Sequence, residues 1–265
     1  MKKTIISMLC LALCAALCLS GFAFAESATP TIDAIKAAGK IIMLTEAAFP
    51  PFEYLSDENE VVGVDVDIAA EIAKDLGVEL EVVDMAFDGI ILAVQSGKGD
   101  FGAAGMTVKP EREEMVNFST KYVKSAQYII VKADSDIKSA ADLAGKTIGV
   151  QQGTTGDFYA TDEVEGSNVM RFNDAITASL DLASGRLDAV ITDELPAKSI
   201  VAANDQLALI EEPLTEEEYA ICVAKEKTDL LEAINKTIER LIAEGKIEAY
   251  INAHMGLAAP EEAAE

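Results

Sequence analysis

The sequence predicts an α/β protein with two similar lobes, each built on a mostly parallel sheet that is flanked by helices. Short apolar runs alternate with amphipathic helical stretches along the chain, which is typical of βαβ units. In addition, residues 96–100 (Ser-Gly-Lys-Gly-Asp) and residues 184–188 (Ser-Gly-Arg-Leu-Asp) each lie between a helical stretch and a short strand. This repeated pattern indicates two lobes of one design, although a chance match of common helix-to-strand turns would also produce it.

The first 25 residues have the pattern of a secretory signal. Lys2 and Lys3 precede an apolar run over residues 5–19, and the small-x-small pattern of residues 23–25 predicts cleavage after Ala25. The run is too short and wrongly flanked for a membrane span. We therefore expect an exported chain, periplasmic or on the extracellular face of the cell membrane. The acidic residues 257–265 are expected to form a disordered tail.

Charge and cysteine usage exclude several classes of function. The net charge of -25 argues against nucleic-acid binding, because no cationic surface can dominate such a field. Three of the four cysteines lie in the signal, and each follows a leucine where a lipid anchor prefers a small residue. Only Cys222 and one histidine remain, so no disulfide, metal or other cofactor is expected.

The first part of the mature chain alternates as strand, helix, strand, helix, strand. Residues 46–54 follow the first strand, and Pro50 and Pro51 predict a rigid loop there. Near the end of the chain, a strand at 219–224 is expected to return to this lobe. The expected strands are 41–45, 78–83, 101–104 and 219–224, and the expected helices are 32–38, 65–76, 90–95, 229–244 and 246–254.

The middle of the chain predicts a second lobe of the same kind. A turn rich in glycine and threonine, residues 151–156, separates one of its strands from a helix and forms a candidate anion site. The alternative is a simple helix cap by Thr154 or Thr155. The expected strands are 126–131, 147–150, 168–172, 189–193 and 207–210, and the expected helices are 139–144, 157 onward, 174–183 and 195–203.

The stretch from Gly105 to Arg112 carries the strongest candidate site. Pro110 suits the first turn of a helix, and Arg112 follows near the amino-terminal end of that turn, where a cation opposes the helix dipole. An anionic partner would justify this position. A small carboxylate would satisfy the guanidinium, the Thr107 hydroxyl and backbone N–H groups together. The alternative is that Arg112 pairs at the surface with a neighbouring glutamate.

The other candidates lie at the carboxyl ends of the predicted strands, where α/β sheets bind ligands. Their types match a zwitterion: Arg112 suits a carboxylate, whereas Asp193 and the Gly105 carbonyl can accept from an ammonium. Phe49 and Phe87 could cover an aliphatic stem or a cationic head, although either could pack in the core, and Asp193 could cap a helix. The candidates are Glu46, Phe49, Phe87, Gly105, Thr107, Gln151, Thr154 and Asp193.

Six ordered motifs resemble the periplasmic polar amino-acid-binding proteins of ABC importers, solute-binding protein family 3. They lie at residues 48–54, 62–67, 87–89, 104–112, 149–156 and 188–194 and cover almost the whole mature chain. The resemblance implies a type II periplasmic-binding-protein fold with one lobe at 26–124 and 219–256 and the other at 125–218. Crossings near 122–127 and 213–219 would join them. It further implies a monomeric, non-enzymatic protein that closes on an amino acid and delivers it to a membrane ABC permease.

The resemblance also implies roles for individual residues. Arg112 would hold the ligand's α-carboxylate, with Thr107 and the turn Gly153, Thr154 and Thr155 completing the cradle, and Asp193 would hold the α-ammonium. Ala104 and Gly105 lie beside them, and Phe49 and Phe87 would enclose the ligand's side chain.

Glu46 is the predicted determinant of specificity. An acid beside two aromatic faces suits a guanidinium or ammonium, so the sequence favours arginine or lysine, and Gln151 points the same way. Glutamine and cystine remain alternatives. The alternative from another class is a secreted dehydratase of prephenate or arogenate type, which shares this fold and would recruit Glu46 or Glu194 as a general acid.

Overall fold

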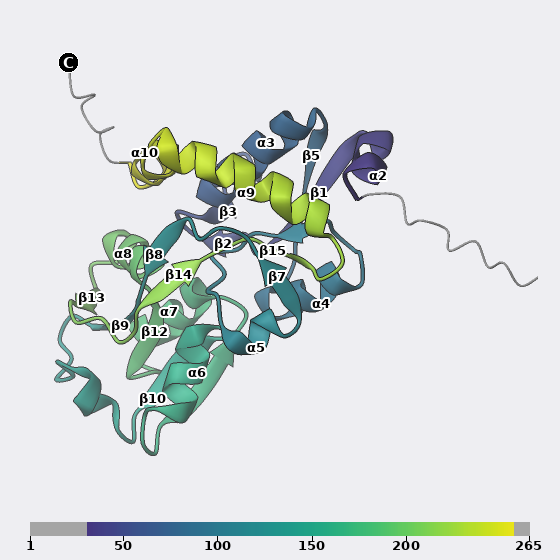
Figure 1. Cartoon of the computed structure of the whole chain (residues 1–265). Helices are drawn as coiled ribbons and strands as arrows, with labels where there is room; N and C mark the ends of the chain where they lie inside the picture. The colour runs from purple at the N-terminus through teal and green to yellow at the C-terminus, as the bar shows by residue number, and fades with distance from the viewer. Residues whose placement is uncertain (1–30, 257–265) are drawn as a thin grey trace, which may run out of the picture. The chain divides into compact units, whose positions relative to one another are not determined.

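The computed structural model describes residues 31–256 (Figure 1). The predicted signal peptide, the short leader after it and the predicted acidic tail lie outside these residues. In the part of the chain from 31 to 256, no helix combines the length and the apolar character that crossing a membrane requires.

Two five-stranded sheets form the framework, and we call each sheet with its helices a lobe. The first sheet has the order β5-β1-β6-β15-β7 and the second has the order β11-β10-β12-β9-β13. The first sheet comprises β1 (Lys40–Thr45), β5 (Glu79–Asp84), β6 (Phe101–Gly102), β7 (Val116–Phe118) and β15 (Cys222–Ala224). The second comprises β9 (Gln127–Lys132), β10 (Thr147–Gln151), β11 (Asn168–Phe172), β12 (Ala189–Asp193) and β13 (Leu207–Ile210).

The two sheets share one topology. In each, a single strand runs against the others: β15 in the first sheet and β9 in the second. The two similar turns, at 96–100 and 184–188, precede β6 and β12. Each of these strands is third in the order of its sheet. The predicted fold class of two mostly parallel α/β lobes is therefore confirmed, and the repeated sequence pattern reflects a repeated architecture.

Two short strands carry the chain between the lobes. β8 (Val123–Ser125) and β14 (Glu217–Tyr219) pair antiparallel, with Glu217 opposite Ser125 and Tyr219 opposite Val123. The single strand predicted at 219–224 is wrong in this respect. The predicted strand is interrupted after Tyr219 because β14 pairs with β8 in the crossing, whereas β15 pairs with strands of the first sheet.

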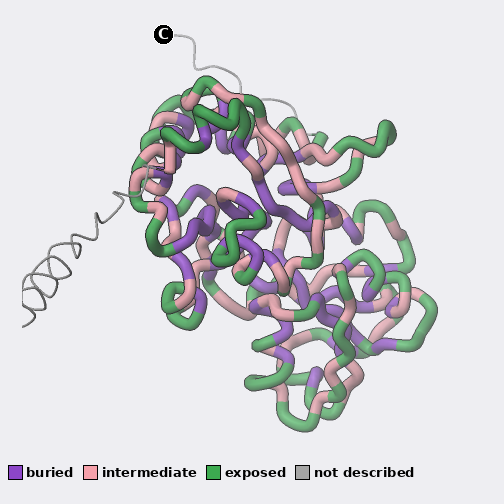
Figure 2. Tube along the Cα trace, turned by 90° about the vertical axis from the view of Figure 1, so that its right-hand side faces the viewer, coloured by how far each residue is buried: buried purple, intermediate pink, exposed green. Residues whose placement is uncertain are grey.

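Helices cover both faces of each sheet. The first lobe carries α2 (Thr31–Ala38), α3 (Val64–Leu76), α4 (Ile90–Gln95), the short α5 (Pro110–Glu113), α9 (Thr228–Ala243) and α10 (Lys246–His254). The second carries α6 (Thr155–Asp162), α7 (Ala175–Ala183) and α8 (Glu194–Ala203), and short 3₁₀ turns η1 (Phe87–Gly89) and η2 (Ala140–Leu143) complete the elements. Each sheet lies between two apolar clusters, so its central strands are among the most buried segments (Figure 2), whereas the edge strands β5 and β11 are partly exposed.

The segment predicted as a loop at 46–54 contributes to a small antiparallel sheet. β2 (Ala48–Phe49), β3 (Glu53–Leu55) and β4 (Val61–Val62) pair in the order β2-β3-β4. Pro50 and Pro51 occupy the turn between β2 and β3, where a missing N–H costs no ladder bond. The proline argument against a central strand therefore holds, but it does not exclude this short hairpin.

Gly63 fixes the small sheet to the start of α3, and we expect Gly63→Ala to destabilise the protein by about 2–3 kcal/mol. Its φ is +137°, and an added Cβ would lie 2.1 Å from the backbone carbonyl oxygen of Phe52. Gly77, which ends α3 at φ +73°, has open space around its Cβ position, so Gly77→Ala should cost only about 1 kcal/mol. Urea unfolding of both variants checks this. Equal losses would contradict the steric argument.

Candidate ligand-binding site

The carboxyl ends of strands from both lobes converge on one inner cavity. Every residue predicted for the site lines it except Gly153, and one residue that was not predicted, Glu53, joins them. The lining residues are Glu46, Phe49, Glu53, Phe87, Ala104, Gly105, Thr107, Arg112, Gln151, Thr154, Thr155 and Asp193.

Arg112 is buried between the lobes. Its side chain is 8% exposed, and its guanidinium donates to the carbonyl oxygen of Thr107 at 2.7 Å and to that of Gly153 at 3.0 Å. The guanidinium also lies 5.3 Å from the centre of the Phe87 ring. The alternative of surface pairing with a neighbouring glutamate is therefore wrong. Burial lowers the pKa of Arg112, but an arginine stays charged, so the cavity has a fixed cation.

Asp193 ends β12 and faces the cavity. It holds the cap position of α8, yet its side chain makes no capping bond. It accepts instead from the hydroxyl of Tyr219, on the crossing strand β14. Burial raises the pKa of Asp193 to about 7, and the nearby Glu217 adds to the rise. The capping alternative is therefore wrong, because the carboxyl group faces the cavity and not the N–H groups of α8.

Glu46 ends β1 and contacts the opposite lobe. Its Oε2 accepts from Nε2 of Gln151 at 3.2 Å, and the same amide nitrogen donates to the carbonyl of Asn173 at 3.0 Å. Burial raises the pKa of Glu46 to about 7, and the bond from Gln151 opposes this rise. Glu46 and Gln151 thus form one of the polar contacts that hold the two lobes together.

Glu53 is the cavity residue that the sequence reasoning missed. It is 1% exposed, and burial, followed by the charge of Asp65, raises its pKa well above the usual value. Among the described residues neither of its oxygens has a hydrogen-bond partner, and burial together with the nearby charge of Asp65 favours the neutral form of this acid. The sequence signal that could have found Glu53 is a lone acid between Phe52 and Tyr54, inside the predicted rigid loop.

Asp65 links this acid to the stretch around Gly105. It accepts from the Gly105 N–H at 2.9 Å and from the Tyr122 hydroxyl at 2.7 Å. Phe49 packs so closely on Gly105 that an added Cβ would lie 2.5 Å from its ring. These contacts fix the backbone whose carbonyl was predicted to accept from an ammonium.

The turn at 151–156 uses part of its hydrogen-bonding capacity on itself. The Gly153 N–H donates to Asp157 at 3.0 Å, and the Thr154 hydroxyl oxygen caps α6 by accepting from the Asp157 N–H. Thr155 and Thr107 donate their hydroxyl protons to Glu217. The anion-binding groups left at this turn are the backbone N–H groups at the start of α6.

Acids outnumber cations around the inner cavity: three carboxyl groups, from Glu46, Glu53 and Asp193, surround it together with the single guanidinium of Arg112. Its volume is about 10 Å³, about the room that one water molecule needs. A larger ligand can therefore bind only if the lobes separate and contacts with the ligand replace some of the contacts between the lobes.

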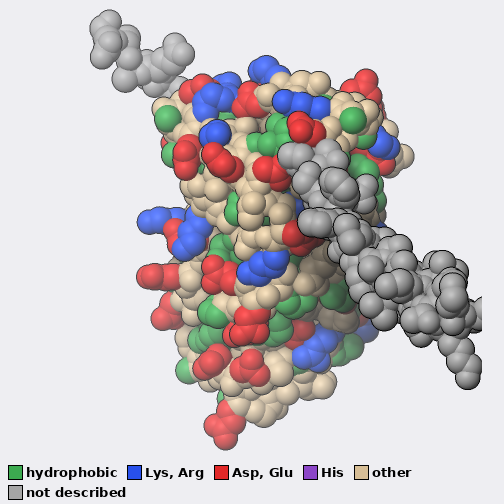
Figure 3. Space-filling view, turned by 45° about the vertical axis from the view of Figure 1, so that its right-hand side comes forward, with side chains coloured by type: hydrophobic (Ala, Val, Ile, Leu, Met, Phe, Trp, Pro, Cys, Tyr) green, Lys and Arg blue, Asp and Glu red, His purple; other side chains and the backbone are tan. Residues whose placement is uncertain are grey.

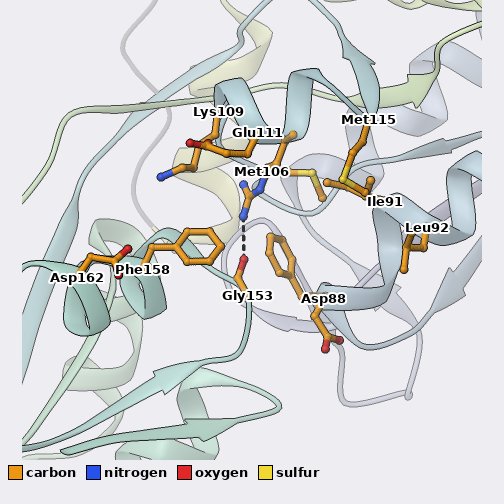
Figure 4. A pocket seen from close by; sticks show the side chains of 12 residues that line it. Asp88, Ile91, Leu92, Met106, Lys109, Glu111, Met115, Gly153, Phe158 and Asp162 are labelled. Carbon is orange, nitrogen blue, oxygen red and sulfur yellow. Dashed lines mark hydrogen bonds between the residues drawn. The ribbon is translucent and has the colours of Figure 1, made fainter. Parts of the chain in front are cut away.

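An outer pocket of about 470 Å³ lies next to the inner cavity and shares Phe87 and Arg112 with it. Figure 4 shows Met106, Met115, Ile91 and Phe158 around it, with the bond to Gly153 at its base. Its walls are mainly apolar. Its three acids, Asp88, Glu111 and Asp162, are exposed, whereas the acids of the inner cavity are buried. We therefore take the inner cavity as the candidate ligand site.

No group of three or more His, Cys, Asp or Glu side chains within residues 31–256 is arranged to hold a metal ion. Cys222 is buried in the first lobe, and burial raises the pKa of its thiol to about 12. On the face shown in Figure 3, acidic side chains are spread among lysines and arginines.

Residues 41–256 match the bacterial extracellular solute-binding proteins, family 3. The chain belongs to this family. The chain is similar to the L-cystine-binding protein TcyJ of Escherichia coli (strain K12), with 32% identity over 221 residues, which cover 82% of this chain and 83% of TcyJ.

Solved structures support the same assignment. The arginine-bound form of truncated ArgBP from T. maritima is 44% identical, with a TM-score of 0.77 over 79% of this chain and 99% of that one. The ancestral amino acid-binding protein AncCDT-1, a precursor of cyclohexadienyl dehydratase, is 32% identical, with a TM-score of 0.79 over 85% and 99% of the two chains. These likenesses confirm the type II fold.

Proposed function

We propose that this family 3 protein captures an L-amino acid with a cationic side chain, arginine or lysine, and delivers it to a membrane ABC permease. The observation that carries the proposal is the charge of the inner cavity, where three carboxyl groups accompany one guanidinium. Burial favours the neutral form of Glu53, so the acids that carry charge are Glu46 and Asp193. A zwitterion balances Arg112 and Asp193 and leaves Glu46, which a second positive charge on the ligand would balance. The arginine-bound form of ArgBP supports this reading.

In the proposed complex, the ligand replaces contacts that now join the lobes. Its α-carboxylate takes the Arg112 donor that bonds to Gly153, and its α-ammonium donates to Asp193 and the Gly105 carbonyl. Its side-chain cation takes the place of the Gln151 amide at Glu46, beside Phe49. The ligand enters while the lobes are apart, and bending at β8 and β14 closes them.

We further propose that the protein acts outside the cell membrane as a monomer and is not an enzyme. The description of its family as extracellular and the signal-like first 25 residues support the location. The dehydratase alternative has support from the likeness to AncCDT-1 and from Glu46, whose pKa near 7 suits a general acid. Turnover of prephenate or arogenate by the purified protein would establish that alternative.

A thermal-shift screen against the twenty amino acids and cystine, followed by calorimetry of the hits, tests the proposed ligand. Arginine or lysine should raise the melting temperature most, because a ligand that binds only the folded state stabilises it by mass action. A dominant shift with cystine or glutamine would assign the cavity to a neutral side chain and reject the basic one.

Arginine affinity should rise with pH between about 5 and 8. Glu46 and Asp193 have pKa values of about 7 without ligand, so below pH 7 binding must displace their protons, which costs up to about tenfold in affinity per pH unit for each group. Calorimetry across this range measures the effect, and Glu46→Gln should flatten the profile. A pH-independent affinity would contradict the assignment.

A further inference from the structure

Glu217 lies on the crossing strand β14 and is 7% exposed. Its Oε2 accepts from the hydroxyls of Thr107 at 2.6 Å and Thr155 at 2.9 Å and from Nε2 of Gln127 at 3.3 Å, while its Oε1 accepts from the hydroxyl of Thr215 at 2.8 Å. Four donors on one carboxylate is close to its full capacity.

The donors come from both lobes and from the crossing between them. Thr107 follows the first-lobe strand β6, Thr155 begins the second-lobe helix α6, and Gln127 begins the second-lobe strand β9. Thr107 also bridges to Tyr219 of the crossing strand. One oxygen of Glu217 therefore joins the two walls of the inner cavity through the segment on which closure depends.

We infer that Glu217 is a positioning residue for the amino-acid site, holding Thr107 and Thr155 in register across the closed lobes without itself lining the inner cavity. The inference rests on the proposed function, since it concerns affinity for the proposed ligand. A carboxylate can only accept, so each hydroxyl directs its proton at Glu217. Thr107 then presents oxygen lone pairs to the cavity, so it suits a ligand ammonium as an acceptor and does not donate to the ligand carboxylate, the role that the resemblance implied for it.

The neighbouring acids have no such role. Glu216 is exposed, and Glu218 pairs with Lys121 at the surface. Within the acidic segment 211–218, burial and converging donors single out Glu217. The Glu217 carboxylate should tolerate little displacement, because a shift of roughly half an ångström in a binding group already weakens ligand affinity.

Two reciprocal variants separate geometry from charge. Glu217→Gln keeps the length and one oxygen that can accept from Thr107 and Thr155, so arginine should bind within about threefold of wild type. Glu217→Asp keeps the charge but withdraws it by one methylene, so the dissociation constant should rise about tenfold or more. Glu216→Gln makes the same charge change on the exposed neighbour and should leave affinity unchanged. Calorimetry measures all three.

A double-mutant cycle tests whether Glu217 acts through Thr107. In the Thr107→Val background the hydroxyl is gone, so Glu217→Asp should cost clearly less affinity than it does in the wild type. Additive losses would overturn the inference. It would also be overturned if the glutamine variant lost as much as the aspartate variant or if neither lost affinity. If the wild type binds no amino acid, the proposed function fails; if it binds and only these variants disagree, this inference fails alone.

Discussion

Arginine binding should weaken by about 3–5 kcal/mol in the Arg112→Ala variant, the largest loss expected from any single change at the site. The guanidinium is buried and is the only cation lining the inner cavity within the described residues. Removing it leaves the ligand's α-carboxylate desolvated without its charged partner. Titration calorimetry measures the loss, which corresponds to more than a hundredfold in the dissociation constant.

Two further variants sharpen this test. Arg112→Lys keeps the charge but cannot donate to two acceptors in the fork geometry, so it should recover only part of the affinity. Arg186→Ala is the control. It removes an exposed arginine of the second lobe that pairs with Asp181 and does not line the inner cavity, so arginine binding should not change. Wild-type affinity in Arg112→Ala would remove Arg112 from the site.

The Glu46→Gln variant should lose about 2–4 kcal/mol of affinity for arginine and lysine but much less for glutamine. The carboxyl group is buried and already accepts from an amide, Gln151, in the position proposed for the ligand's cation. A glutamine there keeps the shape and removes the charge. Comparing the three ligands by calorimetry decides the matter, and equal losses for all three would reject Glu46 as the specificity residue.

The same substitution should also change the stability of the ligand-free protein. Burial holds the pKa of Glu46 above its value in the unfolded chain, so stability is greatest below about pH 4 for this group and falls as pH rises through about 7. Glu46→Gln removes this term and should make the variant more stable than wild type at pH 8. Glu60→Gln, an exposed change in the same lobe, serves as the control for charge alone.

Much of the fold could be predicted because its elements have strong local signals. The predicted bounds of α4, α10, β11, β12 and β13 agree with the structure, since each has a clear periodicity and a turn at its end. β7 was missed because three residues show no periodicity, and its place depends on pairing with β15 from far along the chain.

The site divides in the same way. Asp193 ends one predicted strand and Arg112 lies shortly after another, and their residue types already suggested opposite poles of one ligand. Glu53 and Glu217 lie in segments that resemble an ordinary loop and an ordinary acidic surface, so only their burial in the folded chain distinguishes them.

The sequence by itself determined that this chain has two α/β lobes of one design and which strand ends carry the polar groups, because short-range periodicity and turn chemistry set these features. Only the tertiary structure decided that Arg112 turns to Gly153 and not to its own glutamates, and that the protons of Thr107 and Thr155 go to Glu217. Those choices depend on which groups are excluded from water together, and that follows from contacts between segments about 40 to 110 residues apart.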